Sequence, residues 1–452
     1  MVVADIQSID LLPLTQSKLG WGRRGSASWQ RGIVAAFFML ACPVIVVLPW
    51  VALEHFENSI VSTISALLRQ GPVDFLCAYY PQLRSDVFLA YLGWVIFQGI
   101  LYSTLTGNGL HRGQKTPSGH VLEYKVNGFA AWTLSVTIAI GCTWMKVFDL
   151  AIIAKQWGAL IATLNAYGLV LAVVFYIKAH IYPTHEGDRR FSGSFFYDLY
   201  MGIELNPRLF SQYWDVKLFH NGRPGIIGWA LIDLSFIAQQ YQKHGIITHS
   251  IIITFILHVL YIADFFYHED WYLRTIDIAH DHFGFYLAWG SAAFLPSMYT
   301  LQTQFLARSP LELHPALAAL VLAVGIGGYY IFRSANNQKD NVRKLGGKWQ
   351  DSEVIECSYT TADGIKHHSV LLCSGWWGFS RHPNYLGDLL LSYAMCATCG
   401  LNHLLPWSYA IFMTTILTHR CLRDEAKCAE KYGEYWEAYS ERVPWRLLPG
   451  VW

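Results

Sequence analysis

Charged residues are scarce in this sequence. Asp, Glu, Lys and Arg make up 14% of its 452 residues, whereas 53% are hydrophobic and 15% aromatic, and the formal net charge is only +1. Nucleic-acid binding needs an excess of positive charge that this chain lacks, so we expect no nucleic acid as a partner. Such a composition is typical of a membrane protein, and the lipid bilayer is the first partner to expect.

Several familiar sequence features are also missing. The nine cysteines are an odd number, and Cys42 and Cys142 lie in apolar runs, so no disulfide framework is expected. Cys396 and Cys399 have a zinc-like spacing but no second ligand pair, and we expect no metal. The first 32 residues lack the apolar core and cleavage site of a signal peptide. Neither a Gly-rich dinucleotide fingerprint nor a P-loop is present, so any nucleotide would bind outside a Rossmann domain.

Long runs with little or no charge dominate the sequence. Eight of them could cross a bilayer as helices: 33–53, 87–107, 128–148, 157–177, 225–243, 245–263, 283–306 and 314–332. A ninth run, 389–418, has no formal charge and is too long for one span, and Gly400 and Pro406 in its middle divide it into two. We therefore predict an all-α polytopic membrane protein with about ten transmembrane helices.

Ten spans place both termini on one side of the membrane. The segments on that side are the basic ones, which identifies it as cytosolic by the positive-inside rule. The predicted organisation is a cytosolic tail (1–32), spans one to eight (33–332), a cytosolic loop (333–388), spans nine and ten (389–418) and a cytosolic C-terminal tail (419–452). Within the 333–388 loop, two strand-like runs flank Asp363-Gly364, which predicts a β-hairpin.

The last eighty residues carry the strongest chemical signal. Cations recur at helical steps of three and four around Asp424, so one helix face would suit a phosphate-bearing ligand. These cations are Arg420, Lys427 and Lys431, and the aromatic residues among and after them are Tyr432, Tyr435, Trp436 and Tyr439. Basic residues at a membrane exit often only meet lipid headgroups, but the interleaved aromatic rings favour a nucleotide site. Lys339 and Arg343, four residues apart, form a second candidate phosphate clamp.

Acidic, histidine and tyrosine side chains crowd the segment 271–286. Ionisable groups at the mouth of a span are costly unless they are paired or functional. His280 and His282 would point to different faces of a helix, which argues against a metal site. A proton source and a purely structural hydrogen-bonded network both remain open for this segment.

The sequence resembles the sterol reductase family over nearly the whole chain beyond residue 32. The motifs that carry the resemblance are Thr116-Pro117-Ser118-Gly119, Gly202 to Arg208, Asn221 to Gly225, Trp271 to Gly290, Asn337 to Asp340, Arg381 to Asp388 and His419 to Glu425. Members are ten-span endoplasmic reticulum proteins that reduce a ring double bond of a sterol with NADPH. The resemblance therefore implies NADPH as cofactor, a sterol pocket within spans one to eight, and a multi-pass location in the endoplasmic reticulum or the outer nuclear envelope.

The resemblance also implies which residues contact the nucleotide. The matching positions are Lys339, Arg343, Leu372, Trp377, Asn384, Tyr385, Asp424, Cys428, Ala429, Glu430, Lys431, Tyr432 and Tyr439. Arg420 and Arg423 join them from the cationic C-terminal segment. We thus expect a C-terminal cytosolic NADPH-binding region.

Within the family, two segments indicate the substrate. Val354 to Gly364 with His367-His368, and His419 to Glu425, look like the branch that reduces C7=C8 of Δ5,7 sterols, which implies conversion of 7-dehydrocholesterol to cholesterol. Pro383 looks more like the Δ14 and Δ24(28) branches, so Δ14 reduction is the alternative. Other sterol-biosynthetic membrane enzymes, such as the Δ8/Δ7 isomerase, are candidate partners.

Two hypotheses from other functional classes, a non-catalytic scaffold and a methyltransferase, each match part of the sequence. A non-catalytic sterol-binding scaffold like the lamin B receptor would carry a long N-terminal region, whereas only 32 residues precede the first span here. The Arg-His-Pro-x-Tyr motif at Arg381 is also similar to that of membrane methyltransferases of the isoprenylcysteine type, which are much shorter chains.

The implied reaction needs both a proton and a hydride. A ring alkene is a poor hydride acceptor, so an acid would protonate the diene and the nicotinamide would deliver hydride to the resulting cation. Asp388, Tyr286 and Asp277 are the candidates for donating this proton or polarising the diene, and His280 is a further candidate that would act behind them.

Overall fold

The structure is a computed structural model in which residues 25–360 and 366–452 are described. Their chain is mostly helical and forms two compact units. The N-terminal unit comprises residues 25–313 and Thr398–Pro406, and the C-terminal unit comprises His314–Ala397 and Trp407–Trp452. Each unit has a hydrophobic core of its own.

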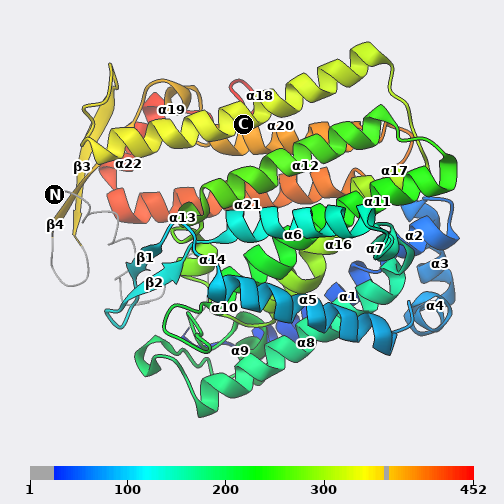
Figure 1. Ribbon diagram of the computed structural model, residues 1–452. Helices are drawn as coiled ribbons and strands as arrows, with labels where there is room; N and C mark the ends of the chain where they lie inside the picture. Colours follow the sequence, from blue (N-terminus) through cyan, green and yellow to red (C-terminus); the bar gives the residue numbers. More distant parts are fainter. Residues whose placement is uncertain (1–24, 361–365) are drawn as a thin grey trace. The chain divides into compact units, whose positions relative to one another are not determined.

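The N-terminal unit is a bundle of helices with one small hairpin (Figure 1). Its longer helices are α1 (Trp29–Ile45), α5 (Ser85–Thr104), α6 (Gly128–Trp144), α8 (Trp157–Ile181), α11 (Gly228–His244) and α12 (His249–Tyr267). Shorter ones are α2 (Leu48–His55), α3 (Ile60–Gln70), α4 (Pro72–Tyr79), α7 (Ile152–Lys155), α9 (Phe195–Met201), α10 (Val216–His220), α13 (Glu269–Tyr272), α14 (Ile276–Ala279), α15 (Phe285–Trp289), α16 (Leu295–Met298) and α17 (Leu301–Arg308). Strands β1 (Leu110–Lys115) and β2 (Val121–Lys125) pair antiparallel.

An ion pair without solvent contact ties three segments of this unit together. Arg223 lies in a π-helical turn, Asn221–Ile227, and its guanidinium is 2.5 Å from the carboxylate of Glu269 on α13. Both side chains are 0% exposed. Glu269 also accepts from the N–H of Gly128, and Arg223 donates to the side-chain oxygen of Asn127 at 2.9 Å. Buried charges need such complete pairing, because an unpaired one costs several kcal/mol.

The C-terminal unit is built on the long helix α18 (Pro315–Lys344). Helix α20 (Pro383–Ala397) packs against α18, and α21 (Ser408–Tyr432) packs against α20. Helices α19 (Trp376–Phe379) and α22 (Glu434–Arg442) and a hairpin of β3 (Val354–Thr360) and β4 (Lys366–Leu372) complete the unit. Gly328 of α18 and Gly387 of α20 let the two helices touch, because a Cβ on Gly328 would lie 2.7 Å from the carbonyl oxygen of Gly387. Small residues allow this close approach of helix backbones.

The structure confirms part of the predicted topology. Five helices are long and apolar enough to span a membrane: Trp29–His55, Ser85–Thr104, Trp157–Ile181, His249–Tyr267 and Pro315–Lys344. The other expected spans are shorter or interrupted, since α6 and α11 have 17 residues each and the run 283–306 is divided among α15, a π-helical turn, α16 and α17. The uncharged run 389–418 does divide, with α20 ending at Ala397 and α21 beginning at Ser408.

The predicted hairpin in the 333–388 loop is confirmed. Strands β3 and β4 pair in register from Val354 with Leu372 to Thr360 with Lys366. The Asp363-Gly364 turn lies outside the described residues, as does most of the predicted N-terminal tail.

Candidate functional site

The predicted nucleotide residues of α20 and α21 meet in the C-terminal unit. The hydroxyl of Tyr385 on α20 donates to Asp424 on α21 at 2.8 Å. Asp388 lies one helical turn beyond Tyr385, half-buried, and its carboxylate has no hydrogen bond or ion pair among the described residues. The hydroxyl of Tyr385 therefore links α20 to α21, one helical turn from Asp388.

Four of the expected contact residues are buried in the small cores of this unit. Leu372 and Trp377 are 7% and 5% exposed and pack with Val342 of α18, and Tyr432 and Tyr439 belong to a second small core. The indole N–H of Trp377 donates to the carbonyl of Ala335 at 2.8 Å, which fixes α19 against α18. These side chains hold the helices that carry the polar groups.

Two lysines lie over aromatic rings. The ammonium of Lys339 is 3.8 Å from the centre of the Trp377 ring, and that of Lys431 is 3.9 Å from the centre of the Tyr359 ring on β3. Such cation–π contacts hold a lysine ammonium over the face of an aromatic ring. Tyr359 is a member of the site that sequence reasoning missed, because only the fold brings β3 to α21.

Other polar groups of this unit have unused bonding capacity. Arg343, at the end of α18, is exposed and makes no hydrogen bond or ion pair within the described chain. Nε of Arg423 and the side-chain oxygen of Asn384 are buried and have no hydrogen-bond partner among the described residues. Buried polar atoms usually have partners, so these groups fit a bound polar ligand such as a phosphate-bearing cofactor.

Glu425 organises the loop that precedes α20. Its two carboxylate oxygens lie 3.2 Å from Nε of Arg381 and 2.8 Å from Nε of Arg446. His382 stacks on the ring of Tyr385, with ring centres 5.2 Å apart. Burial, together with the positive charges of Lys339, Arg381 and Arg446, lowers the pKa of His382 to about 3, so this histidine is neutral at physiological pH.

The remaining catalytic candidates lie in the N-terminal unit. Asp277 is on the four-residue helix α14, His280 follows that helix, and Tyr286 on α15 is 37% exposed. Residues 280–284 are not helical, so the expectation that His280 and His282 lie on different helix faces is wrong: α14 ends at Ala279.

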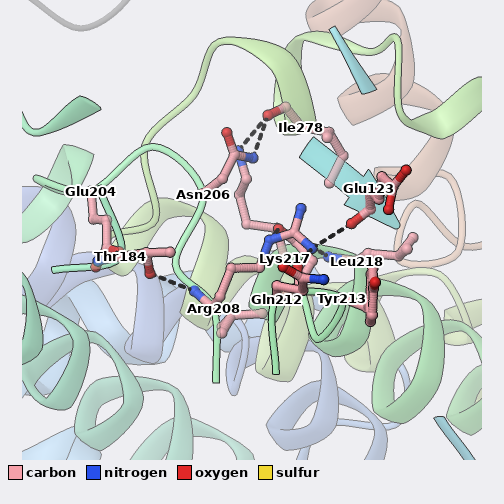
Figure 2. A network of polar contacts seen from close by, with 12 residues as sticks. Glu123, Thr184, Glu204, Asn206, Arg208, Gln212, Tyr213, Lys217, Leu218 and Ile278 are labelled. Carbon is pink, nitrogen blue, oxygen red and sulfur yellow. Dashed lines mark hydrogen bonds and ion pairs between the residues drawn. The ribbon is translucent and has the colours of Figure 1, made fainter. Parts of the chain in front are cut away.

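A polar network fixes the loop that carries Asp277 and His280 (Figure 2). The ammonium of Lys217, on α10, donates to the carbonyl oxygens of Asp277, Ile278 and Asp281 at 2.6–2.8 Å. Figure 2 shows the amide of Asn206 pointing at the carbonyl of Ile278, which it reaches at 3.0 Å. The sequence marked Asn206 only as part of a polar turn and did not mark Lys217.

Further ion pairs extend this network. Lys178 on α8 pairs with Glu204 at 2.9 Å, and Arg208 pairs with Asp215 at 3.4 Å. Arg208 also donates to the carbonyl of Glu123 on β2 and lies over the ring of Tyr124 at 4.2 Å. Hairpin β1–β2, the 202–215 loop and α10 are thereby held together.

Comparisons with known proteins are consistent with these features. The chain matches the ergosterol biosynthesis ERG4/ERG24 family over residues 25–452. It is 40% identical to "7-dehydrocholesterol reductase" of Xenopus laevis over 95% of this chain and 94% of the relative, and 40% identical to "Probable 7-dehydrocholesterol reductase" of Acanthamoeba polyphaga mimivirus over 97% and 99%. It is 33% identical to "Delta(14)-sterol reductase" of Dictyostelium discoideum over 93% and 91%. The chain therefore belongs to the ergosterol biosynthesis ERG4/ERG24 family, which is the sterol reductase family.

Proposed function

We propose that this sterol reductase reduces the C7=C8 bond of Δ5,7 sterols, such as 7-dehydrocholesterol, with NADPH. The observation that supports the choice of bond is that the relatives of 40–41% identity are named for 7-dehydrocholesterol reduction, whereas those named for Δ14 reduction are 33% identical, as is one further relative named for 7-dehydrocholesterol reduction. Δ14 reduction is the second candidate, since Pro383 matches the Arg-His-Pro motif of that branch.

The choice of a phosphate-bearing cofactor rests on the C-terminal unit. Arg343, Arg423 and Lys431 supply positive charge, and Asn384 supplies an unused acceptor. Positive side chains suit phosphates, and the adjoining tyrosine rings suit the flat parts of a nucleotide. Bound NADPH would supply the hydride, and the chain's own residues would supply the proton and the shape of the pocket.

Four side chains are candidates for the proton donor. Asp388 in the C-terminal unit, or one of Asp277, His280 and Tyr286 in the N-terminal unit, is proposed to hold or move the proton that is transferred to the diene, while hydride completes the saturated C7–C8 bond. One proton and one hydride balance the reduction of one double bond. An environment without bulk water would strengthen the effect of these groups on the developing cation.

The first experiment is an assay with both sterol classes. Membranes from a host lacking Δ7 reductase, expressing this chain, should convert 7-dehydrocholesterol to cholesterol with NADPH, which is followed by loss of the diene absorbance and identification of the product. Replacing Arg420 and Arg423 should abolish this conversion. Reduction of an 8,14-diene alone would move the protein to the Δ14 branch, and inactivity toward both sterols would contradict the proposal.

Arg343 offers a sharper test of the nucleotide site. Arg343→Ala should raise the KM for NADPH about 10- to 100-fold, because a hydrogen bond to a charged group contributes about 1.5–3 kcal/mol, with little change in the KM for sterol. Lys344→Ala is the matched control: Lys344 is the next residue, is exposed and pairs with Asp340 at 2.6 Å. Equal effects of the two substitutions, or none from Arg343→Ala, would contradict this role.

A further inference from the structure

We propose that Lys217 is a positioning residue for sterol reduction: its ammonium fixes the backbone of residues 277–281 and thereby orients Asp277 and His280. This inference rests on the proposed function, in which these two side chains handle the proton. Among the described residues, the ammonium of Lys217 bonds to backbone carbonyls of this loop and not to the side chains of Asp277 and His280.

The geometry of Lys217 is that of a coordinating cation. An ammonium has three N–H groups, and Lys217 uses them on three carbonyl oxygens, those of Asp277, Ile278 and Asp281. Two of these oxygens belong to α14, where a positive charge also complements the negative end of the helix dipole. The side chain is 3% exposed, so water does not compete for these contacts.

The position of Lys217 is itself fixed. Asp215 caps α10, because its carboxylate accepts from the N–H of Leu218 at 2.8 Å, and the same carboxylate lies 3.4 Å from Arg208. Asn206, from the 202–208 motif, supports the same target by donating to the carbonyl of Ile278. The ammonium therefore meets the loop from a rigid base.

The far end of the loop is fixed as well. The N–H of Phe283 donates to the carbonyl of Glu204 at 2.9 Å, and Gly284 touches Gly202 so closely that a Cβ on either would overlap the other's backbone. Asp277 and His280 lie between these anchors. The loop has few backbone bonds of a regular helix, so its shape depends on these side-chain contacts.

The buried ammonium also predicts a pH limit. Burial lowers the pKa of Lys217 to about 8, although Asp215, Asp277 and Asp281 oppose the shift and Arg208 reinforces it. Above that pH, the neutral amine has two N–H groups and one lone pair for three carbonyl oxygens, so one contact becomes repulsive. The rate of the wild-type protein should therefore fall above about pH 8.

Lys217→Met tests the proposal, since methionine has a similar length and no charge. With whichever sterol the wild-type protein reduces, kcat should fall about 100-fold, because displacement of a catalytic group by about 1 Å can cost that much. The KM for NADPH should not change. Asn206→Ala should lower kcat about 3- to 10-fold in the same manner, because Lys217 still satisfies the carbonyl of Ile278.

Gln240→Leu is the matched control. Gln240 on α11 is fully buried, and its side chain accepts from the N–H of Thr248 at 2.8 Å and donates to the carbonyl of Leu306 at 2.7 Å, partners that do not belong to residues 277–281. It should lower the thermal unfolding midpoint as Lys217→Met does, yet leave kcat within about threefold of wild type. This difference separates positioning from general stabilisation.

The outcomes are distinct. A folded Lys217→Met protein with near-normal kcat, or one in which kcat falls no more than in Gln240→Leu, would overturn the proposal. If Lys217→Met does not fold, Asn206→Ala decides: an unchanged kcat together with no loss of wild-type rate above pH 8 would also overturn it. An active wild type with these results refutes only this inference, whereas a wild type inactive on every sterol refutes the proposed function.

Discussion

His382 lies among three positive groups and is almost fully buried. The charged form of this histidine is disfavoured by burial first and then by Lys339, Arg381 and Arg446, and Glu425 does not reverse the effect because two arginines already neutralise it. The folded pKa of about 3 is below the ordinary value of 6.5. The unfolded chain therefore binds more protons between these values, and stability must fall as pH decreases through this window.

His382→Gln should remove this dependence. Between pH 6.5 and pH 5, the wild-type free energy of unfolding should fall by up to about 1.4 kcal/mol per pH unit because of this one group, and the variant should lose correspondingly less. Thermal unfolding in detergent at several pH values measures the difference in slope. Parallel curves for both proteins would show that His382 does not titrate in the unfolding transition.

For single residues, the sequence predicted which residues group in the candidate site better than it predicted their contacts. The motif resemblance brought Tyr385 and Asp424 into one predicted site, and the 2.8 Å hydrogen bond between them agrees with that grouping. The role of Glu425 was not predictable, because its partners Arg381 and Arg446 lie on distant segments. Leu372 and Trp377, which are expected to touch the nucleotide, are both buried against Val342 of α18, and this packing was not predictable because α18 and β4 are separate segments of the chain.

The helix pair α18 and α20 depends on two glycines. A side chain at Gly328 would lie 2.7 Å from the carbonyl oxygen of Gly387 and 2.8 Å from the backbone nitrogen of Leu391, and neither backbone atom can move aside cheaply. Tyr385 and Asp388 share α20, and Lys339 and Arg343 share α18. The spacing of these candidate site residues is therefore set by the glycine contact.

Gly328→Ala should destabilise the protein by about 1–3 kcal/mol, as overpacking of a tight contact does, and should reduce affinity for NADPH. Gly327→Ala is an ideal control on the same helix, since a Cβ there meets no atom within 4 Å. Unfolding midpoints and KM for NADPH should change for the first variant only. If both variants behave alike, the glycine contact does not set the spacing.

Helices and strands were predictable where a short stretch of sequence determines them. The uncharged runs located most helices, and the Asp-Gly turn signal located the β3–β4 hairpin. The interruption of the run 283–306 was not predicted, although Gly290 and Pro296 lie within the run and α17 is more polar than the unbroken helices.

The ten-span arrangement remains a prediction for the whole molecule. Five helices are long and apolar enough to span a membrane. In the ten-span arrangement, which also counts shorter helices as spans, the segment 54–86 would lie on the lumenal side. Cys77, on α4 within that segment, is exposed and belongs to no disulfide.

Labelling of the Cys77 thiol can therefore test the membrane topology. In sealed microsomes, a membrane-impermeant thiol reagent should label it only after the vesicles are permeabilised. Glu430→Cys, at an exposed position of α21 that is predicted to be cytosolic, should be labelled in intact vesicles when made in a Cys77→Ser background. Labelling of Cys77 before permeabilisation would reverse the orientation or change the number of spans.

The pairing of Arg223 with Glu269 has a consequence for synthesis of the chain. Arg223 leaves the ribosome 46 residues before its partner, and both become fully buried in the finished unit. Until Glu269 has been made, the π-helical turn that carries Arg223 has an uncompensated positive charge, which is costly in a lipid environment. Lateral release of α6 and α11 into the bilayer should therefore wait until α13 has emerged, so that these helices leave the translocon as a group rather than singly.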